Sequence, residues 1–288
     1  MADGARWGAI DGGQMPRTWA GSWTTVGEYA AATHFGPTLA VTSFTVALAL
    51  AAGAGTRTPL IAAAVLAGQL SIGWSNDYLD AGIDRAAGRT DKAVVRGTVS
   101  ERGLLRAAVV AAVCAVPLSL ANGLAAAAAA LTTVGCGWAY NLGLKRTLAS
   151  PLPYLLAFAL TPPAFVALAL DRTPQPQVVV AGGLLGLCAH LTNGVKDVDA
   201  DALTGVRGLP QRLGPRRSGL LSAALLLVAA LVLLPGGSPS TVSLVLAVAA
   251  GALAVAYAAM LAGRRPSRHA FTLNLLAVAL LIAAVIAR

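Results

Sequence analysis

Apolar runs long enough to cross a membrane recur along the chain, and this pattern constrains the fold more than any other sequence feature. A membrane-spanning helix needs roughly 20 consecutive apolar residues. Charged residues make up only 11% of the 288 residues, whereas soluble globular domains contain about 25%. We therefore predict an all-α, polytopic membrane protein. About nine transmembrane helices are expected, near residues 37–54, 58–76, 103–121, 123–142, 151–170, 176–195, 217–235, 241–262 and 269–287.

The basic residues alternate between the loops that join these runs. The loops after the second, fourth, sixth and eighth runs are rich in Lys and Arg, whereas the opposite loops hold only Arg57 and Arg172. By the positive-inside rule the first set is cytoplasmic, which places the N-terminus inside and the C-terminus outside. The net charge of +9 is therefore a topology signal, and no nucleic-acid partner is expected. The excess of Arg over Lys, with abundant Ala and Gly, indicates a bacterial plasma membrane.

The N-terminal segment, the cysteines and a glycine pair complete the predicted domain organisation. Residues 1–30 form a polar segment without a signal-peptide pattern, and 31–288 are predicted to form a single transmembrane domain. The three cysteines lie inside apolar runs without CxxC spacing, which predicts free thiols and no metal or disulfide framework. Gly182 and Gly186 form a GxxxG pattern, which favours close helix packing.

Carboxylates are concentrated in two of the predicted cytoplasmic loops, 77–102 and 196–216. These loops hold eight of the twelve acidic residues, and the carboxylates begin at the membrane ends of the runs, where an unpaired charge is costly. The eight are Asp77, Asp80, Asp84, Asp91, Glu101, Asp197, Asp199 and Asp201.

The spacing within each loop predicts a stripe of carboxylates on one helix face. Asp77, Asp80 and Asp84 follow i, i+3, i+7 spacing, which on a helix falls within about 60° of arc. Asp197 and Asp201 follow i, i+4 spacing, whereas Asp199 points away. An amide side chain precedes each stripe, at Asn76 and Asn193.

Oxygen-only donors of this kind are typical of a Mg²⁺ site that also takes phosphate oxygens from a substrate. Cations lie beside both stripes, at Arg89, Lys92, Lys196 and Arg207. Basic side chains next to a Mg²⁺ site can neutralise a diphosphate as it leaves. The pattern therefore indicates ionisation of an allylic diphosphate; the alternative is that each Asp merely pairs with a local Arg or Lys.

Three segments resemble the UbiA superfamily of intramembrane prenyltransferases. NDYLDAGID at 76–84 matches the first signature, NDxxDxxxD, and KDVDAD at 196–201 resembles the second, DxxxD. YNLGLKRT at 140–147 is similar to the Tyr/Lys segment of the family at the end of the fourth span. The resemblance covers the chain after residue 30.

The resemblance implies a helix bundle around a lateral cavity that takes the isoprenyl tail, with Mg²⁺ holding the diphosphate. It implies that Tyr140 hydrogen-bonds phosphate or stabilises the allylic cation, although a core tyrosine is also compatible with the sequence. The implied metal ligands are Asp77, Asp80, Asp84, Asp197 and Asp201. The implied diphosphate contacts are Asn76, Arg89, Lys92, Lys145, Lys196 and Arg207, and we add Asn193, the amide before the second stripe, to this predicted set.

We therefore expect an enzyme that transfers an isoprenyl group from an allylic diphosphate to an aromatic or quinone-precursor acceptor. The segment 33–37, Thr-His-Phe-Gly-Pro, lacks the Arg-Pro pair common in quinone-pathway members near this place. A terpene cyclase of the same superfamily therefore remains an alternative. A transporter is less compatible, because both stripes lie on one side of the membrane rather than near its midplane.

Overall fold

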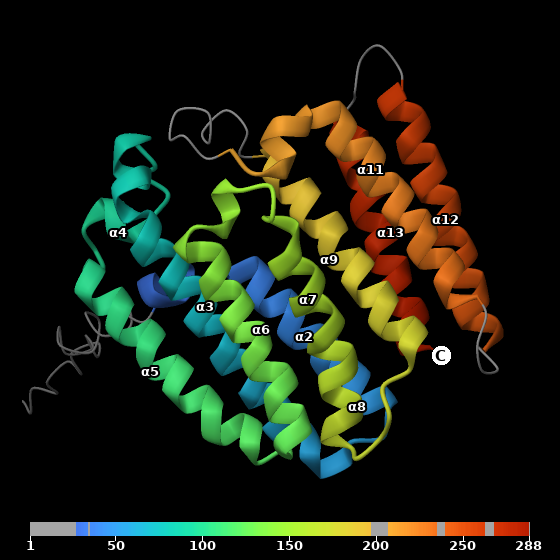
Figure 1. The fold of residues 1–288 in the computed structure, drawn as a ribbon, viewed down its shortest axis with the longest axis horizontal. Coiled ribbons are helices and arrows are strands. Elements are labelled where there is room, and N and C mark those ends of the chain that lie inside the picture. Colours follow the sequence, from blue (N-terminus) through green and yellow to red (C-terminus); the bar gives the residue numbers. More distant parts are fainter. Residues whose placement is uncertain (1–26, 34, 197–206, 235–239, 263–267, 288) are drawn as a thin grey trace, which may run out of the picture.

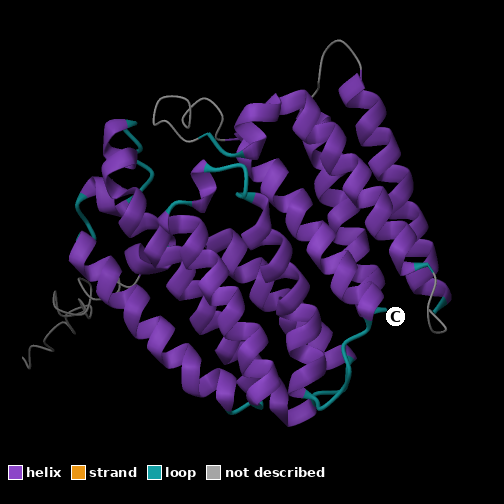
Figure 2. Cartoon of the chain, in the orientation of Figure 1, coloured by secondary structure: helices purple, strands orange, loops and turns teal. Residues whose placement is uncertain are grey.

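The computed structural model describes residues 27–33, 35–196, 207–234, 240–262 and 268–287. Every regular element within these ranges is a helix (Figures 1 and 2). The all-α prediction is therefore confirmed. The longer helices are α2 (Phe35–Ala51), α3 (Thr58–Ala86), α5 (Glu101–Leu120), α6 (Leu124–Leu142), α7 (Pro151–Ala159), α9 (Pro176–Lys196), α11 (Leu209–Leu233), α12 (Thr241–Ala262) and α13 (Arg268–Ile286).

Each predicted apolar run coincides with a helical segment in the described part of the chain. Five segments are long and apolar enough to cross a membrane: Gly55–Ala86, Glu101–Leu120, Pro151–Ala169, Leu209–Leu233 and Thr241–Met260. The apolar helix α2 is shorter. A multi-pass membrane protein is therefore supported, while the nine-span count and its orientation stay predictions.

The helices form two groups, which lie on opposite sides in Figure 1. In one group, Ala49, Ile61 and Phe165 bring α2, α3 and the segment after α7 into one buried cluster with α6. In the other, Leu226 and Leu281 help to pack α9, α11, α12 and α13 together. The helix α7 lies against α9, and this contact joins the two groups.

Two prolines interrupt the helical segment that begins with α7. The chain passes from α7 through a wider turn, η3 (Leu160–Ala164), into α8 (Phe165–Ala169). Thr161 leaves helical geometry (φ −127°, ψ 122°), and Pro162 follows through a cis peptide bond. Pro162 and Pro163 supply no backbone N–H, so the helical hydrogen bonds cannot continue through them. The predicted run 151–170 is therefore two helices with a break, and this break borders the cavity described below.

Glycines allow α7 and α9 to approach closely, in agreement with the packing predicted for Gly182 and Gly186. A Cβ atom at Gly186 would lie 2.3 Å from the carbonyl oxygen of Tyr154. A Cβ atom at Gly182 would lie 2.5 Å from the carbonyl oxygen of Phe158. Both obstacles are backbone atoms, which cannot rotate away, so a larger residue would separate the helices.

We predict that Gly186→Ala lowers the stability of the protein by about 1–3 kcal/mol, the usual range for overpacking. Thermal unfolding in detergent measures the change. Gly135→Ala in α6 is the matched control, because no atom lies within 4 Å of its Cβ position. Equal unfolding temperatures for the two variants would contradict the close contact between α7 and α9.

Candidate active site

A cavity of about 420 Å³ lies between α2, α3, α6, α7 and α9. Residues of α3 from Gln69 to Ala87 line it, and the rise of an α-helix makes this wall about 27 Å long. Its charged end holds Asp80 and Asp84 of α3, together with Lys145. Farther along α3, towards Gln69, the walls become mainly apolar and aromatic. The cavity therefore offers a charged end and a mainly apolar interior.

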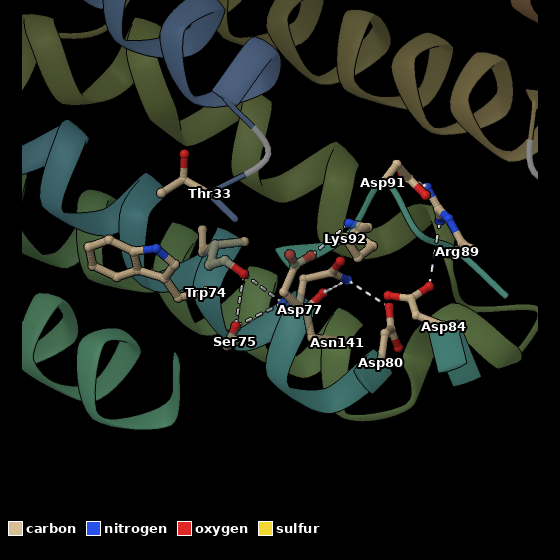
Figure 3. A network of polar contacts seen from close by, with 12 residues as sticks. Thr33, Trp74, Ser75, Asp77, Asp80, Asp84, Arg89, Asp91, Lys92 and Asn141 are labelled. Atoms are coloured by element: carbon tan, nitrogen blue, oxygen red, sulfur yellow. Dashed lines mark hydrogen bonds and ion pairs between the residues drawn. The ribbon is translucent and has the colours of Figure 1, made fainter. Parts of the chain in front are cut away.

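The three carboxylates of α3 each lie beside a cation, and Figure 3 shows Asp77 with Lys92 and Asp84 with Arg89. The side chain of Asp77 is 1% exposed, and its Oδ1 lies 2.7 Å from Nζ of Lys92. Asp84 is 7% exposed, and its Oδ1 lies 3.6 Å from Nη1 of Arg89. Asp80 pairs with Lys145, which comes from the short helix η2 (Leu144–Arg146). Two of these cations come from the loop after α3 and one from η2, so segments separated in the sequence meet at this end of α3.

The loop after α3 returns two of these cations to the carboxylates. Gly88 takes a left-handed conformation (φ +65°), which favours glycine. The N–H of Arg89 then donates to the carbonyl of Asp84 at 3.0 Å. Val94 is buried against a cluster that includes Leu104. This packing anchors the segment that carries Lys92.

Arg89 contacts a second carboxylate outside the helix. Its Nη2 donates a hydrogen bond to Oδ2 of Asp91 at 3.0 Å, and this bond lowers the pKa of Asp91. Asp91 is exposed, and Glu101 pairs with Arg85 at the surface. Neither residue lines the cavity among the described residues, so these two acids of the first loop belong to surface pairs.

Asn141 of α6 connects the two helices that carry most of the charged end (Figure 3). Its Nδ2 donates to Oγ of Ser75 at 2.9 Å and to the carbonyl of Ile72 at 3.0 Å. Its Oδ1 accepts a hydrogen bond from Nδ2 of Asn76 at 3.0 Å. Asn76 also donates to Oδ2 of Asp80 at 3.1 Å. Sequence reasoning gave Asn141 no role, although its position next to Tyr140 in YNLGLKRT could have indicated one.

Aromatic rings form the wall next to the charged end. The ring centroids of Tyr140 and Tyr154 lie 5.1 Å apart in an edge-to-face arrangement, and Phe158 stacks on Tyr154 at 6.2 Å. All three side chains line the cavity. The sequence singled out Tyr140 but not Tyr154 or Phe158, which lie within an ordinary apolar run.

His190 lies behind this wall and serves to position it. It is 2% exposed, and its ring packs against Tyr140 and Tyr154. Its Nε2 lies 3.0 Å from Oγ of Ser150, which also accepts a hydrogen bond from the N–H of Leu209 at 3.1 Å. These contacts connect α9 with the beginnings of α7 and α11.

Of the predicted site residues on and after α9, only some are described by the structure, and only one of these lines the cavity. Asn193 lines the cavity near the end of α9. Lys196 is the last residue of α9. Arg207 is exposed before α11 and is not among the residues that line the cavity. Asp197 and Asp201, with Asp199, lie outside the described residues, so the second stripe stays a prediction.

The described residues supply part of a metal site. Within these ranges no three His, Cys, Asp or Glu side chains lie close enough together to hold a metal ion. Oδ2 of Asp84 is buried and receives no hydrogen bond from any described residue. A buried carboxylate oxygen of this kind is costly unless a cation or donor satisfies it. It is also the donor type that Mg²⁺ prefers, so the residues fit such an ion if the second stripe completes the site.

We predict that Asn141→Leu, which keeps the side-chain size but removes the amide, destabilises the protein by about 1–3 kcal/mol because Ser75 and Asn76 lose partners. The same change should weaken binding of inorganic diphosphate by about tenfold or more, since Asn76 loses its support. Thermal unfolding and diphosphate binding measure the two effects. The control is Asn122→Leu in the turn after α5, where Nδ2 donates only to the carbonyl of Leu118. Equal diphosphate binding by both variants would contradict the role of Asn141.

The chain is similar to one curated protein over about half of its length. Digeranylgeranylglyceryl phosphate synthase from Pyrococcus abyssi is 29% identical over 160 residues, which make up 51% of this chain and 53% of that protein. The match thus spans only about half the length of this relative.

Two solved structures resemble almost the whole chain in fold. One is a UbiA homologue from Archaeoglobus fulgidus bound to GPP and Mg²⁺, with a TM-score of 0.68 and 18% identity over 90% of this chain and 98% of that one. The other is described as digeranylgeranylglyceryl phosphate synthase in membranes, with a TM-score of 0.67 and 16% identity over 91% and 98% of the two chains. The sequence model of the UbiA prenyltransferase family matches residues 39–281. The resemblance found in the motifs therefore holds for the whole domain, and the chain belongs to the UbiA prenyltransferase family.

Proposed function

We propose that this protein is an intramembrane prenyltransferase that uses Mg²⁺ and an allylic isoprenyl diphosphate. The observation that carries the proposal is a single cavity that joins a charged end to an apolar interior. Asp80, Asp84 and Lys145 line the charged end, and Tyr140 and Tyr154 line the wall beside it. An isoprenyl diphosphate has the same division between a highly charged head and an apolar tail. The A. fulgidus homologue bound to GPP and Mg²⁺ supports this substrate class.

The cations of the charged end would bind the diphosphate. Lys145 and Lys92 are each held by a carboxylate of α3, and Arg89 is held between Asp84 and Asp91. Cations fixed in this way need little reorganisation when the leaving group gains charge. Asn76 and Asn193 would add amide hydrogen bonds. Lys196 and Arg207, which flank the second acidic motif in the sequence, are proposed as further diphosphate contacts.

The residues proposed to hold Mg²⁺ are Asp77, Asp80, Asp84, Asp197 and Asp201. A bound Mg²⁺ supplies positive charge that stabilises the diphosphate as a leaving group. The unsatisfied oxygen of Asp84 supports this assignment. Asp77 lies beneath Lys92 rather than among the lining residues, so Asp80 and Asp84 are the carboxylates of this stripe that border the cavity.

In the proposed reaction, the bond between C1 of the isoprenyl group and the diphosphate oxygen breaks, and the electron pair leaves with the diphosphate. The allylic cation that remains would lie near the ring faces of Tyr140 and Tyr154, which attract positive charge. A nucleophilic atom of the acceptor then bonds to C1 and releases its proton. The same rings would help to keep water away from the cation, which would limit its hydrolysis.

The acceptor is proposed to be lipophilic. The sequence led us to expect an aromatic ring or quinone precursor. The name of the P. abyssi relative describes a product in which geranylgeranyl groups are joined to glyceryl phosphate, so a glyceryl phosphate lipid is a second candidate. An assay with an aromatic acceptor, an assay with a glyceryl phosphate lipid and a third assay without any acceptor would show which acceptor class the enzyme uses. Terpene hydrocarbons or alcohols formed without acceptor would instead favour the cyclase.

The reaction is proposed to take place at the cytoplasmic face of a bacterial plasma membrane. Arg85, Arg89, Lys92 and Lys145 lie at the ends of helices that border the charged end of the cavity. Basic residues at one set of helix ends favour the cytoplasmic side. Diphosphate substrates made in the cytoplasm would reach the site directly from that side.

We predict that Asp80→Asn and Asp197→Asn each reduce Mg²⁺-dependent diphosphate release by about 10²-fold or more, the usual effect of losing a group that stabilises transition-state charge. Diphosphate release is measured with geranyl, farnesyl and geranylgeranyl diphosphate, each in the presence of an aromatic acceptor or a glyceryl phosphate lipid. Removal of Mg²⁺ with EDTA should abolish release, and added Mg²⁺ should restore it.

The control for these variants is Asp171→Asn, since Asp171 is exposed and pairs with Arg57 away from the cavity. This variant should keep full activity. Unchanged release by both Asp80→Asn and Asp197→Asn would overturn the metal assignment and with it the proposed mechanism.

A second prediction separates the two roles implied for Tyr140. If its ring face stabilises the allylic cation, Tyr140→Phe retains most activity and Tyr140→Leu loses about tenfold or more. If its hydroxyl binds phosphate, both variants lose activity and bind inorganic diphosphate more weakly. Single-turnover rates and diphosphate binding, measured on both variants, distinguish these outcomes.

A further inference from the structure

The interior end of the cavity is polar at the level where an isoprenyl tail would be expected to meet only apolar side chains. Gln69 of α3, Thr133 of α6 and Thr161 at the break after α7 line this end. Gln69 and Asp80 lie on the same helix, and the rise per residue places them about 16 Å apart along its axis. Gln69 is therefore too far from Asp80 to act on the diphosphate, and the polar residues at this end of the cavity require another explanation.

The hydrogen-bonding capacity of these residues is only partly used. The single hydroxyl hydrogen of Thr133 faces three acceptors: the carbonyls of Ala129 at 3.1 Å and Ala157 at 3.4 Å, and Oγ1 of Thr161 at 3.1 Å. Among the described residues, none accepts a hydrogen bond from the hydroxyl of Thr161 or pairs with the amide of Gln69. Both side chains therefore offer polar atoms to whatever occupies this end of the cavity.

A second, much smaller cavity of about 10 Å³ lies directly behind these residues. Gln69, Thr133 and Thr161 line it as well, together with Ser119 of α5. Ser119 is 1% exposed, and its buried hydroxyl has no hydrogen-bond partner in the described ranges. A buried water needs about 10–15 Å³ of such volume and two to four polar partners. The small cavity thus has the size and the polar lining of a site for one water molecule.

We propose that Gln69, Ser119, Thr133 and Thr161 form a polar floor that holds a water molecule and limits the donor tail to about two isoprene units. This inference rests on the proposed function and specifies its substrate. One water cannot satisfy both N–H groups and the carbonyl oxygen of Gln69 as well as the hydroxyls around it, so a longer tail would cover with hydrocarbon those polar atoms of Gln69 and Thr161 that the water leaves unpaired. Polar groups buried in this way lose hydrogen bonds without gaining others, which opposes binding.

The length follows from the geometry of α3. Asn76, which lies at the charged end, and Gln69 are about 10 Å apart along the helix axis. Three bonds of an extended chain span about 3.8 Å, so the four bonds of one isoprene unit span about 5 Å. Two units therefore fill the distance between the diphosphate end and the floor, which corresponds to a geranyl group.

The experiment measures dissociation constants of geranyl, farnesyl and geranylgeranyl thiolodiphosphate in the presence of Mg²⁺, with the full-length protein in lipid nanodiscs. Each constant is referred to the free aqueous concentration of the donor, obtained from its partition into empty nanodiscs. In a wholly apolar channel each added isoprene unit would tighten binding by about a hundredfold or more. We expect the wild-type protein to gain less than about threefold beyond geranyl, because the floor offsets the added contact. A gain of tenfold or more from geranyl to farnesyl would overturn the proposal.

The double variant Gln69→Leu with Thr161→Val replaces the polar atoms with apolar groups of similar size. It should tighten farnesyl relative to geranyl by about tenfold or more. Thr161→Val alone should shift the ratio of the farnesyl and geranyl dissociation constants in the same direction. This single variant is used instead if the double variant does not fold. Gln177→Leu, at the start of α9 and away from the cavity, is the matched control and should leave the ratio unchanged.

An unchanged ratio in the folded variants would overturn the polar floor while leaving the proposed function intact. Failure of all three thiolodiphosphates to bind the wild-type protein, with no competition by inorganic diphosphate, would instead overturn the proposed function, and the polar floor with it. The two failures are therefore distinguishable in one set of titrations.

Discussion

The pairing of buried carboxylates with cations is the interaction on which the candidate site depends. Asp77 and Asp84 are almost fully buried near the end of α3, where an uncompensated charge would be strongly destabilising. Lys92 and Arg89 come back from the loop after α3 to compensate them, and Lys145 reaches Asp80 from the end of α6. The same pairs that make the charges tolerable therefore gather cations around one end of the cavity. Both the stability of the fold and the proposed binding of substrate therefore require these cations to stay next to the carboxylates.

Backbone interruptions give the cavity its shape. The break at Thr161 moves the chain out of helical geometry and brings Thr161 to the interior end of the cavity. The close approach of α7 and α9 at Gly182 and Gly186 brings the aromatic wall next to α9. His190 and Ser150 then hold this wall and the start of α11 together. A continuous helix, or larger residues at the glycines, would leave a different cavity beside the same charged end.

Part of the site was predictable from residue spacing and part was not. The i, i+3, i+7 pattern indicated a carboxylate stripe because helical geometry follows from local sequence, and the stripe lies on α3 as expected. The roles of Asn141, Tyr154 and Gln69 were not predictable, since each depends on contacts between helices that spacing along one helix cannot describe. Arg207 shows the reverse: it follows the second acidic motif, yet in the structure its exposed side chain does not line the cavity.

The sequence by itself determined the all-α class, the apolar segments, the family and the grouping of carboxylates, because these follow from composition and from periodicity along single helices. Only the tertiary structure decided which cation faces which carboxylate, where the aromatic wall stands and how the cavity ends. These features arise where side chains from different helices meet, and their positions depend on helix packing and on the break in helical geometry at Thr161. The second acidic motif was recognised from sequence alone. The floor beneath the proposed isoprenyl tail emerged only when α3, α5, α6 and the break after α7 were brought together.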